Sequence, residues 1–273
     1  MGNLVRMPHS EVTATLEALD KEGVRPEELA KIRMDDSLLK KVAELLKSGK
    51  PAFERRKPFV RALKILGERR VFTPERVAEA LNPLRKRAGL QPLVPPQGVA
   101  IPYSDEVLKK HVDGRWLLIY SYGLSLREQR QMVGTDTNQQ PCFYKEWDWF
   151  LKSAEDHWAG KGVKPGWYLV SLEGRYGSQA WQSQEESIQK EFGSDYERAD
   201  EHLMGEVCLS AYLINNGERP LKDFYHWGKA LGSGGYRVHV GSFAPDGLGV
   251  GRCPPGVDDT PLLRVCLLRK FQK

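Results

Sequence analysis

The chain contains no stretch of about 18 uncharged apolar residues, the length that a membrane-spanning helix requires. Its first residues also lack the apolar block of a secretory signal peptide. These two absences predict a cytoplasmic protein, with display on a cell surface or virion by another route as the alternative. Glycine and proline, at 26 and 17 of 273 residues, are too sparse for collagen-like or low-complexity sequence. We therefore expect a globular protein.

Cysteine is also scarce, and its spacing matches no common metal site. The four cysteines, Cys142, Cys208, Cys253 and Cys266, form no C-x-x-C pair, which argues against a zinc ribbon and a disulfide framework. No cluster of acidic residues has the spacing of a calcium loop. The sequence therefore predicts reduced thiols, and neither a metal nor a cofactor is expected.

Charge and tryptophan are distributed unevenly along the chain. The 41 basic and 36 acidic residues give a net charge of +5, but residues 1–95 hold 20 basic against 13 acidic residues. All seven tryptophans follow residue 115. The basic clusters Arg55–Lys57, Arg69–Arg70 and Arg85–Arg87 are interleaved with acids, so a solvated helix face or an acidic protein partner is favoured over nucleic acid.

Short helices with clear start and stop signals are predicted in the N-terminal third. Two precede residue 50, at Pro26–Ile32 and Asp35–Gly49. Thr73–Glu75 opens another, which Asn82–Pro83 is expected to interrupt. The proline-rich stretch Gln91–Gly98 then favours extended chain. These signals predict a small, basic helical domain over residues 1–95, followed by a second domain over residues 96–273.

Helical and strand patterns mix in the second domain. Trp116–Tyr120 and Trp167–Val170 are strand-like runs, and Ser194–Glu197 resembles a capping box before a long helix that stops at Asn216–Gly217. From Gly234 onward, apolar residues alternate with polar residues and glycine, and a final strand is expected over residues 263–267. Because no βαβ rhythm is present, the predicted class is α+β.

No arrangement of residues in the sequence points clearly to catalysis. His202 and Glu206 stand at i, i+4 on the long helix, but no second histidine joins them, so a polar helix face is favoured. Ser233–Gly235 lacks the order of a phosphate-binding loop. For the aromatic run Phe143–Phe150, core packing is favoured over a sugar or peptide platform. We therefore expect a protein that is not an enzyme.

The C-terminal segment carries a family resemblance. Tyr236–Val238, Gly241–Phe243, the run Gly251–Asp259 and the closing Leu263–Leu267 resemble the C-terminal signature of the formylglycine-generating type of C-type lectin fold. They are similar, in particular, to the variable proteins of diversity-generating retroelements. The resemblance covers about the last 40 residues. It implies a C-type-lectin-like domain over residues 96–273 and a hypervariable recognition surface over about residues 237–263.

The same resemblance implies a restricted residue set in the variable segment. In those proteins, mutagenised adenines scatter asparagine codons into types that exclude Lys, Glu, Gln, Met and Trp. Arg237–Leu263 contains none of these five types. The ligand-binding positions that the resemblance implies are His239, Ser242, Ala244, Pro245, Gly249, Gly251, Arg252, Cys253, Pro254, Gly256, Val257, Thr260 and Pro261.

The expected function is thus non-enzymatic binding of a protein or surface ligand through a diversified C-terminal face. Arg252 and His239 are expected to be its energetic anchors, because the other positions offer little contact area. Two alternatives stay open. One is a formylglycine-generating-type modifying enzyme that uses Cys253 or Cys266, and the other is nucleic-acid or partner binding by the basic N-terminal domain.

Overall fold

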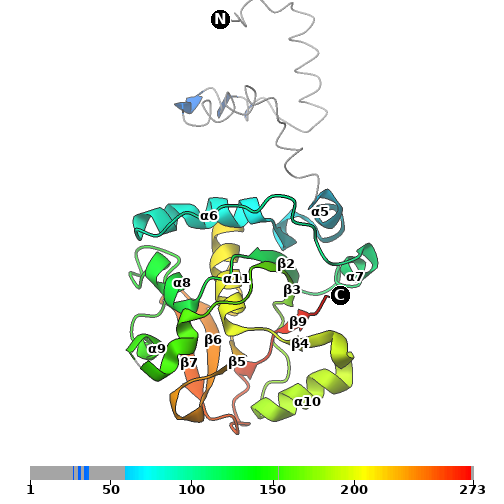
Figure 1. Ribbon diagram of the computed structural model, residues 1–273, viewed down its shortest axis with the longest axis vertical. Helices are drawn as coiled ribbons and strands as arrows, with labels where there is room; N and C mark the ends of the chain where they lie inside the picture. Colours follow the sequence, from blue (N-terminus) through cyan, green and yellow to red (C-terminus); the bar gives the residue numbers. More distant parts are fainter. Residues whose placement is uncertain (1–26, 28–29, 32–33, 37–58, 153, 272–273) are drawn as a thin grey trace, which may run out of the picture. The chain divides into compact units, whose positions relative to one another are not determined.

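The computed structural model describes residues 27, 30, 31, 34–36, 59–152 and 154–271. Contacts divide the chain into two units, Met1–Lys57 and Pro58–Lys273. In the first unit, residues 27, 30, 31, 34 and 36 are helical. Most of the two predicted helices before residue 50, and the whole of Arg55–Lys57, lie outside the described residues. The second unit is a mixed α+β domain, as the sequence predicts (Figure 1).

The predicted boundary at residue 95 falls inside this second unit. The short strand β1 (Val71–Phe72) pairs in parallel with β2 (Trp116–Ser121). Helix α6 (Pro74–Arg87) packs against α11 (Glu201–Ile214). Residues 59–95 are therefore integrated into the fold of residues 58–273, and they contribute a strand as well as helices.

Two side chains on α6 explain why the proline-rich stretch does not separate domains. Asn82 donates to the carbonyl of Leu93 at 3.0 Å and accepts from its N–H at 2.7 Å. The guanidinium of Arg85 donates to the carbonyl of Gln91 at 2.6 Å. These bonds hold the stretch against the helix from which it emerges. Thr73 caps α6 as predicted, but the predicted interruption is wrong, because the helix continues through Pro83 to its end.

The larger sheet brings together strands from distant parts of the sequence. Its order is β1-β2-β3-β9-β4, and every pair except the parallel β1 and β2 is antiparallel. The strands predicted at residues 116–120 and 167–170 are confirmed as β2 and β3. Besides β1 and β2, this sheet contains β3 (Gly166–Ser171), β4 (Tyr196–Arg198) and β9 (Leu267–Arg269).

Both faces of this sheet are covered, so all six residues of β2 are buried. Leu117 and Ile119 join the core cluster around α11, whereas Leu118, between them in sequence, joins a second cluster. The alternation of side chains along a strand accounts for this division. The second cluster includes residues of three helices, α5 (Val60–Leu66), α7 (Asp105–Lys109) and α10 (Trp181–Phe192).

Helix α11 contacts strands of both sheets (Figure 1). Every residue from Glu201 to Ala211 is buried, which is typical of a helix surrounded by protein on all sides. The predicted start of this helix is wrong. Residues 196–198 form β4, and the helix begins after Asp200, whose carboxylate accepts from the N–H of His202 at 2.8 Å. Strand pairing with β9 overrides the local capping signal at residues 194–197.

The smaller sheet has the order β7-β6-β5-β8. The predicted alternation from residue 234 onward is confirmed as the antiparallel hairpin of β6 and β7. The predicted final strand is instead two strands, because β8 pairs with β5 and β9 pairs with β3 and β4 in the other sheet. The strands of the smaller sheet are β5 (Tyr225–Leu231), β6 (Arg237–Ala244), β7 (Gly247–Cys253) and β8 (Leu263–Arg264).

His226 on β5 links the smaller sheet to the chain between β8 and β9. Its Nε2 lies 3.0 Å from the carbonyl oxygen of Ala199, and its Nδ1 lies 3.0 Å from the N–H of Cys266. A neutral ring satisfies both bonds, donating from Nε2 and accepting at Nδ1. Burial lowers the pKa of His226 to about 3, which keeps the ring neutral.

None of the helices among the described residues is both long enough and apolar enough to cross a membrane. The remaining elements of the domain are short. Two helices, α8 (Leu126–Val133) and α9 (Trp149–Lys152), precede β3. The described part of the domain also contains 3-10 turns at Glu68–Arg70, Ala154–Gly160, Gly193–Asp195 and Ser233–Gly235.

Candidate ligand-binding site

The smaller sheet has one apolar face and one face rich in glycine. On the apolar face, Val238, Val240 and Val250 are buried against the core cluster that includes α11. Residues that pair across neighbouring strands form a row and share a face of the sheet. Two such rows lie on the face opposite the apolar one. We call this side the glycine face. Its rows are Tyr225–Gly241–Gly249 and Trp227–His239–Gly251.

Aromatic side chains cover the glycine face. The rings of Trp147 and Tyr225 lie nearly parallel, with their centroids 5.9 Å apart. A Cβ atom at Gly249 would lie 3.2 Å from the Trp147 ring and 3.3 Å from the Tyr225 ring. One at Gly251 would lie within collision distance of the His239 ring. Glycine at these positions therefore lets the rings approach the strand backbone closely.

The loop that carries Trp147 is fastened from two directions. The N–H of Tyr144 donates to the carbonyl of Leu248 on β7 at 3.0 Å. The buried guanidinium of Arg130, on α8, donates to the carbonyls of Tyr144, Lys145 and Trp147 at 2.9 to 3.3 Å. These bonds preorganise the aromatic rings against the sheet.

A cavity of about 190 Å³ opens between this loop and the hairpin of β6 and β7. We call it the aromatic pocket. Ser242 lies in its wall with a φ of 47°, where the backbone N–H donates to the carbonyl of Phe224 at 2.9 Å. Gly247 has a φ of 123°, and a Cβ atom there would collide with the backbone of Phe143 and Tyr144. The pocket is lined by Tyr144, Trp147, Tyr225, Ser242, Asp246, Gly247 and Gly249.

The charge in the lining of the aromatic pocket is negative. Asp246 is its only charged lining residue, and no lysine or arginine joins it in the wall that the described residues form. The carboxylate of Glu146 raises the pKa of the Tyr144 phenol, and the carboxylate of Asp246 adds to the effect. An electronegative, ring-lined cavity is chemically suited to a cation, because aromatic faces and carboxylates both attract positive charge.

His239 lies beside the pocket rather than at the surface. Its ring makes edge-on contacts with Tyr225 and Trp147, at centroid distances of 4.9 and 6.2 Å. Only 7% of the residue is exposed, and its Nδ1 finds no hydrogen-bond partner among the described residues. Burial lowers the pKa of His239 to about 4. The expected role of His239 as an exposed anchor is therefore wrong, and its ring instead supports the aromatic wall.

Arg252, the other expected anchor, is committed to packing. Its guanidinium lies 4.6 Å from the centre of the Trp149 ring and 5.7 Å from that of Tyr236. It also donates to the carbonyl oxygen and hydroxyl of Ser233. These contacts hold the side chain on the protein, so it is not free to reach a ligand without breaking them.

The structure places nine of the thirteen sequence-predicted positions in two groups. Ser242 and Gly249 line the aromatic pocket, and Ala244 and Pro245 lie in or beside the turn that edges it. Residues 254–261 lie instead near the start of α10, where the carbonyl of Pro255 accepts from the N–H of Trp181 at 2.9 Å. Pro245, Pro254, Gly256 and Pro261 are exposed; Ser242, Ala244, Arg252, Cys253, Val257 and Thr260 are half-buried; His239, Gly249 and Gly251 are buried.

Sequence reasoning missed the aromatic residues of the site. Tyr144 and Trp147 belong to the aromatic run for which core packing was favoured, and that interpretation holds for the fully buried Phe143 and Phe150. The two groups differ because Tyr144 and Trp147 are half-buried at the pocket. The available signal was the acid at Glu146 inside the run, since a charged residue favours an exposed segment.

The buried acids of α11 have structural partners. Glu206 accepts from the Ser121 hydroxyl at 2.6 Å and from the N–H of Tyr122 at 2.8 Å. Glu201 accepts from the N–H of Lys229 at 2.8 Å, and His202 accepts at Nδ1 from the N–H of Leu126 at 2.9 Å. Burial raises the pKa of each glutamate to about 7. The expected polar surface for the pair at 202 and 206 is wrong, since both residues are buried.

One group of side chains has the composition of a metal site. Ligand atoms of Asp200, Glu201 and His202 lie within 4.8 Å of one another. All three side chains already accept backbone N–H groups, from residues 202, 229 and 126 respectively. These three side chains therefore have a structural role, which is to fasten loops to the start of α11.

The cysteines favoured by the enzyme alternative lie in different environments. Cys253 is half-buried at the end of β7, and Cys266 is fully buried between β8 and β9. Burial raises the pKa of Cys253 to about 11 and raises that of Cys266 further. Both shifts favour the protonated thiol, whereas the thiolate is the form that acts as nucleophile and metal ligand.

The basic clusters of the N-terminal third also lie in different environments. Arg85 is buried and pairs with Glu128 at 2.6 Å, whereas Lys86 and Arg87 are exposed. Arg69 and Arg70 line a different cavity, described below. Within the described residues, these clusters therefore do not act as one surface.

No protein-family model, no curated protein and no solved structure matches this chain.

Proposed function

We propose that this chain is a non-enzymatic ligand-binding protein whose C-type-lectin-like domain recognises its partner through the aromatic pocket. The observation that carries the proposal is the aromatic pocket, a preorganised cavity at the hairpin of β6 and β7. Four of its seven lining residues, Ser242, Asp246, Gly247 and Gly249, belong to the segment for which the sequence predicts a recognition surface. Strands hold one wall and a tethered loop holds the other, which favours binding without a large ordering cost.

The ligand group we propose for this pocket is a cation. Three aromatic rings and the carboxylate of Asp246 line it, and Glu146 lies near Tyr144. Its volume of about 190 Å³ is below the range of pockets for drug-sized molecules, so it suits a single head group. An ammonium or guanidinium group at the end of a partner's side chain meets both conditions.

The retroelement hypothesis is proposed in a narrower form. Positions 245, 254, 256 and 261 are exposed, so substitutions there change the surface with little effect on stability. Gly249 and Gly251 are covered by rings, and His239 is itself packed among them. We therefore expect variation at the exposed turns and constancy at these three buried positions. Population sequencing of codons 237–263 tests this, and equal variation at codons 249 and 251 would contradict it.

The test of the pocket uses tetramethylammonium as the probe and tert-butanol as a neutral molecule of similar shape. Binding is followed by NMR through the indole N–H signals of the full chain. The Trp147 signal is assigned by its loss in Trp147→Phe. We expect tetramethylammonium, and not tert-butanol, to shift this signal in a saturable way.

Matched variants locate the binding. Their affinities are compared by calorimetric titration, which needs no Trp147 signal. We expect Trp147→Ala and Asp246→Asn each to weaken binding of tetramethylammonium by about tenfold, in the range for cation–π and charge interactions. Tyr236→Ala, which removes an exposed aromatic residue outside the pocket, should leave it unchanged. Equal shifts with tert-butanol, or equal losses in all three variants, would overturn the assignment of a cation site.

A further inference from the structure

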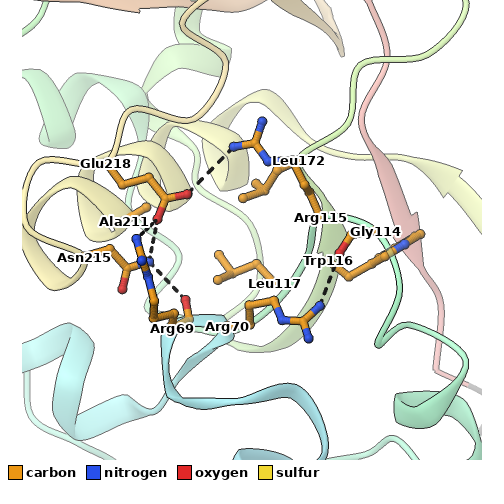
Figure 2. A pocket seen from close by; sticks show the side chains of 10 residues that line it. All are labelled: Arg69, Arg70, Gly114, Arg115, Trp116, Leu117, Leu172, Ala211, Asn215 and Glu218. Carbon is orange, nitrogen blue, oxygen red and sulfur yellow. Dashed lines mark hydrogen bonds and ion pairs between the residues drawn. The ribbon is translucent and has the colours of Figure 1, made fainter.

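A second cavity lies at the start of β2. Glu206 fastens the loop at the other end of this strand. The 3-10 turn before β1, the start of β2 and the end of α11 surround the cavity, and its volume is about 290 Å³ (Figure 2). We call it the arginine pocket. Its lining residues are Arg69, Arg70, Gly114, Arg115, Trp116, Leu117, Leu172, Ala211, Asn215 and Glu218. It shares no residue with the aromatic pocket.

Two arginines of this pocket converge on one carboxylate. Arg69 lies 3.3 Å from one oxygen of Glu218, and Arg115 lies 3.8 Å from the other. Asn215 donates to Glu218 at 2.9 Å and to the carbonyl of Arg69 at 3.0 Å. Figure 2 shows Arg69 and Arg115 reaching Glu218 from different sides of the opening. The single carboxylate therefore serves two guanidinium groups.

The third arginine is held without being neutralised. The Nε atom of Arg70 donates to the carbonyl of Leu66 at 2.8 Å, and Nη1 donates to the carbonyls of Val112 and Gly114 at 2.7 and 3.2 Å. These acceptors carry no net charge, so they fix the guanidinium and leave its positive charge in place. The lining thus contains three arginines and one glutamate.

One further acid lies near the edge of the pocket. Glu173 accepts from the backbone N–H of Arg115 at 3.1 Å, and its other carboxylate oxygen lies 3.5 Å from Arg175. Arg175 also approaches Glu191 at 3.3 Å. Glu173 therefore already has two partners, and the positive excess within the lining persists.

The floor of the pocket is apolar. Leu117 and Leu172 are exposed by 1% and 6%, and Ala211 by 1%, so the floor consists of core residues reached through the opening. In Figure 2, Leu117 and Leu172 project between the charged side chains. A ligand that fits this surface has an anionic end for the arginines and a small apolar body for the leucines.

We infer that the arginine pocket binds a small organic oxyanion, a carboxylate or phosphate joined to a compact apolar group. Guanidinium groups match the geometry of both oxyanions through paired N–H donors. The oxyanion competes with Glu218 for Arg69 and Arg115. It is also attracted by the positive charge of Arg70, which no carboxylate in the lining neutralises. This inference is independent of the function proposed for the aromatic pocket, because no lining residue is common to the two.

The test is calorimetric titration of the full chain at constant ionic strength with four probes. Phenylacetate and phenyl phosphate present the two oxyanions on an apolar ring, phenylethanol is the neutral counterpart, and inorganic phosphate lacks the ring. We expect at least one of the two aromatic oxyanions to bind at least tenfold more tightly than phenylethanol and than inorganic phosphate. The stronger of the two identifies the preferred oxyanion.

Charge variants give effects of opposite sign. Arg69→Gln combined with Arg115→Gln should weaken binding at least tenfold, and Glu218→Gln should strengthen it several-fold by removing the competing carboxylate. Arg87→Gln, an exposed arginine on α6 outside the pocket, is the matched control and should leave affinity unchanged. Thermal melts of each variant verify that the fold is retained.

Three outcomes would overturn the inference. The first is failure of both aromatic oxyanions to bind. The second is an equal effect of Arg87→Gln and the double variant, which would indicate attraction by net charge alone. The third is weaker binding in a folded Glu218→Gln variant, which would show that Glu218 does not compete with the ligand.

Discussion

The aromatic pocket and the arginine pocket are built at different sheets and carry opposite charge. Among the residues that the structure describes, Asp246 is the only charged residue lining the first, whereas three arginines and Glu218 line the second. Residues 1–95 are basic overall and residues 96–273 slightly acidic. The arginine pocket nevertheless combines Arg69 and Arg70 from the basic third with Arg115 from the remainder. Local charge in this protein therefore follows tertiary contacts and not sequence segments.

The two pockets also differ in how much the fold depends on their residues. The aromatic wall is tightly packed against strand backbone at Gly249 and Gly251, with buried His239 beside it. Arg69 and Arg115, in contrast, have side chains that are 78% and 54% exposed. Substitutions at Gly249 and Gly251 should thus affect stability, whereas those at Arg69 and Arg115 should affect binding alone. The following predictions test that contrast.

The largest effect is expected for Gly251→Val. A Cβ atom at this position would collide with the His239 ring, which is packed between Tyr225 and Trp147 and has little room to move. We expect a loss of about 2–4 kcal/mol in the free energy of unfolding, measured by urea denaturation. Gly256→Val is the control, since nothing lies within 4 Å of a Cβ atom there. Similar losses in both variants would show that position 251 is not specially constrained.

A smaller effect is expected from the titration of His239. Its pKa is lowered to about 4 in the folded protein, from an ordinary value of 6.5. The unfolded chain therefore binds the proton first as pH falls, and stability is lost between about pH 6.5 and 4. We expect His239→Gln to remove about 1–2 kcal/mol of this acid destabilisation between pH 7 and 4.5.

The control for that measurement is His157→Gln, which replaces an exposed histidine. Glu201 and Glu206 act in the opposite direction, because their pKa values are raised to about 7 and their protonation favours the folded state. Comparing each variant with the wild type at the same pH cancels this contribution. An unchanged pH profile in His239→Gln would contradict the burial of a neutral ring.

Charge reversal at one pocket should leave the other unaffected. Asp246→Lys should weaken binding of tetramethylammonium by more than tenfold, because it replaces attraction with repulsion, equivalent to about 1.4 kcal/mol or more. Binding of the preferred aromatic oxyanion at the arginine pocket should change by less than twofold. A parallel loss at both pockets, measured by titration, would show that they are coupled or that one of them is misassigned.

The smallest effect is expected for Arg69→Gln. This side chain is largely exposed, and its ion pair with Glu218 is screened by water. We expect a change of less than about 0.5 kcal/mol in the free energy of unfolding, measured by thermal and urea denaturation. A loss above about 1 kcal/mol would assign Arg69 a structural role and weaken the contrast between the pockets.

Local sequence signals predicted those elements whose pattern is strong and uninterrupted. The strands at 116–120 and 167–170 and the hairpin from residue 234 agree with the structure, and Thr73 caps its helix. The same signals failed where distant partners decide the outcome. Residues 196–198 form a strand because β9 pairs with them. Pro83 lies inside α6, whose end is held against Gln91 and Leu93.

The candidate site was predicted in outline only. Alternation along β6 correctly separated the buried valines from the opposite face. It did not indicate that rings from residues 144–147 and 225 would cover that face, and the contact of Trp147 with Gly249 joins segments about 100 residues apart. Position within the segment 237–263 was therefore a poor guide to exposure, and three of the expected ligand-facing positions are buried.

The sequence by itself determined the α+β class, the main strands and the apolar face of the hairpin, because these depend on side-chain periodicity over a few residues. Only the tertiary structure decided where the pockets lie and what charge each has. Each pocket is formed by side chains from several separate segments, and the distance between such segments in space is set by packing. The approach of Trp147 to Gly249 and of Arg69 to Glu218 illustrates that dependence.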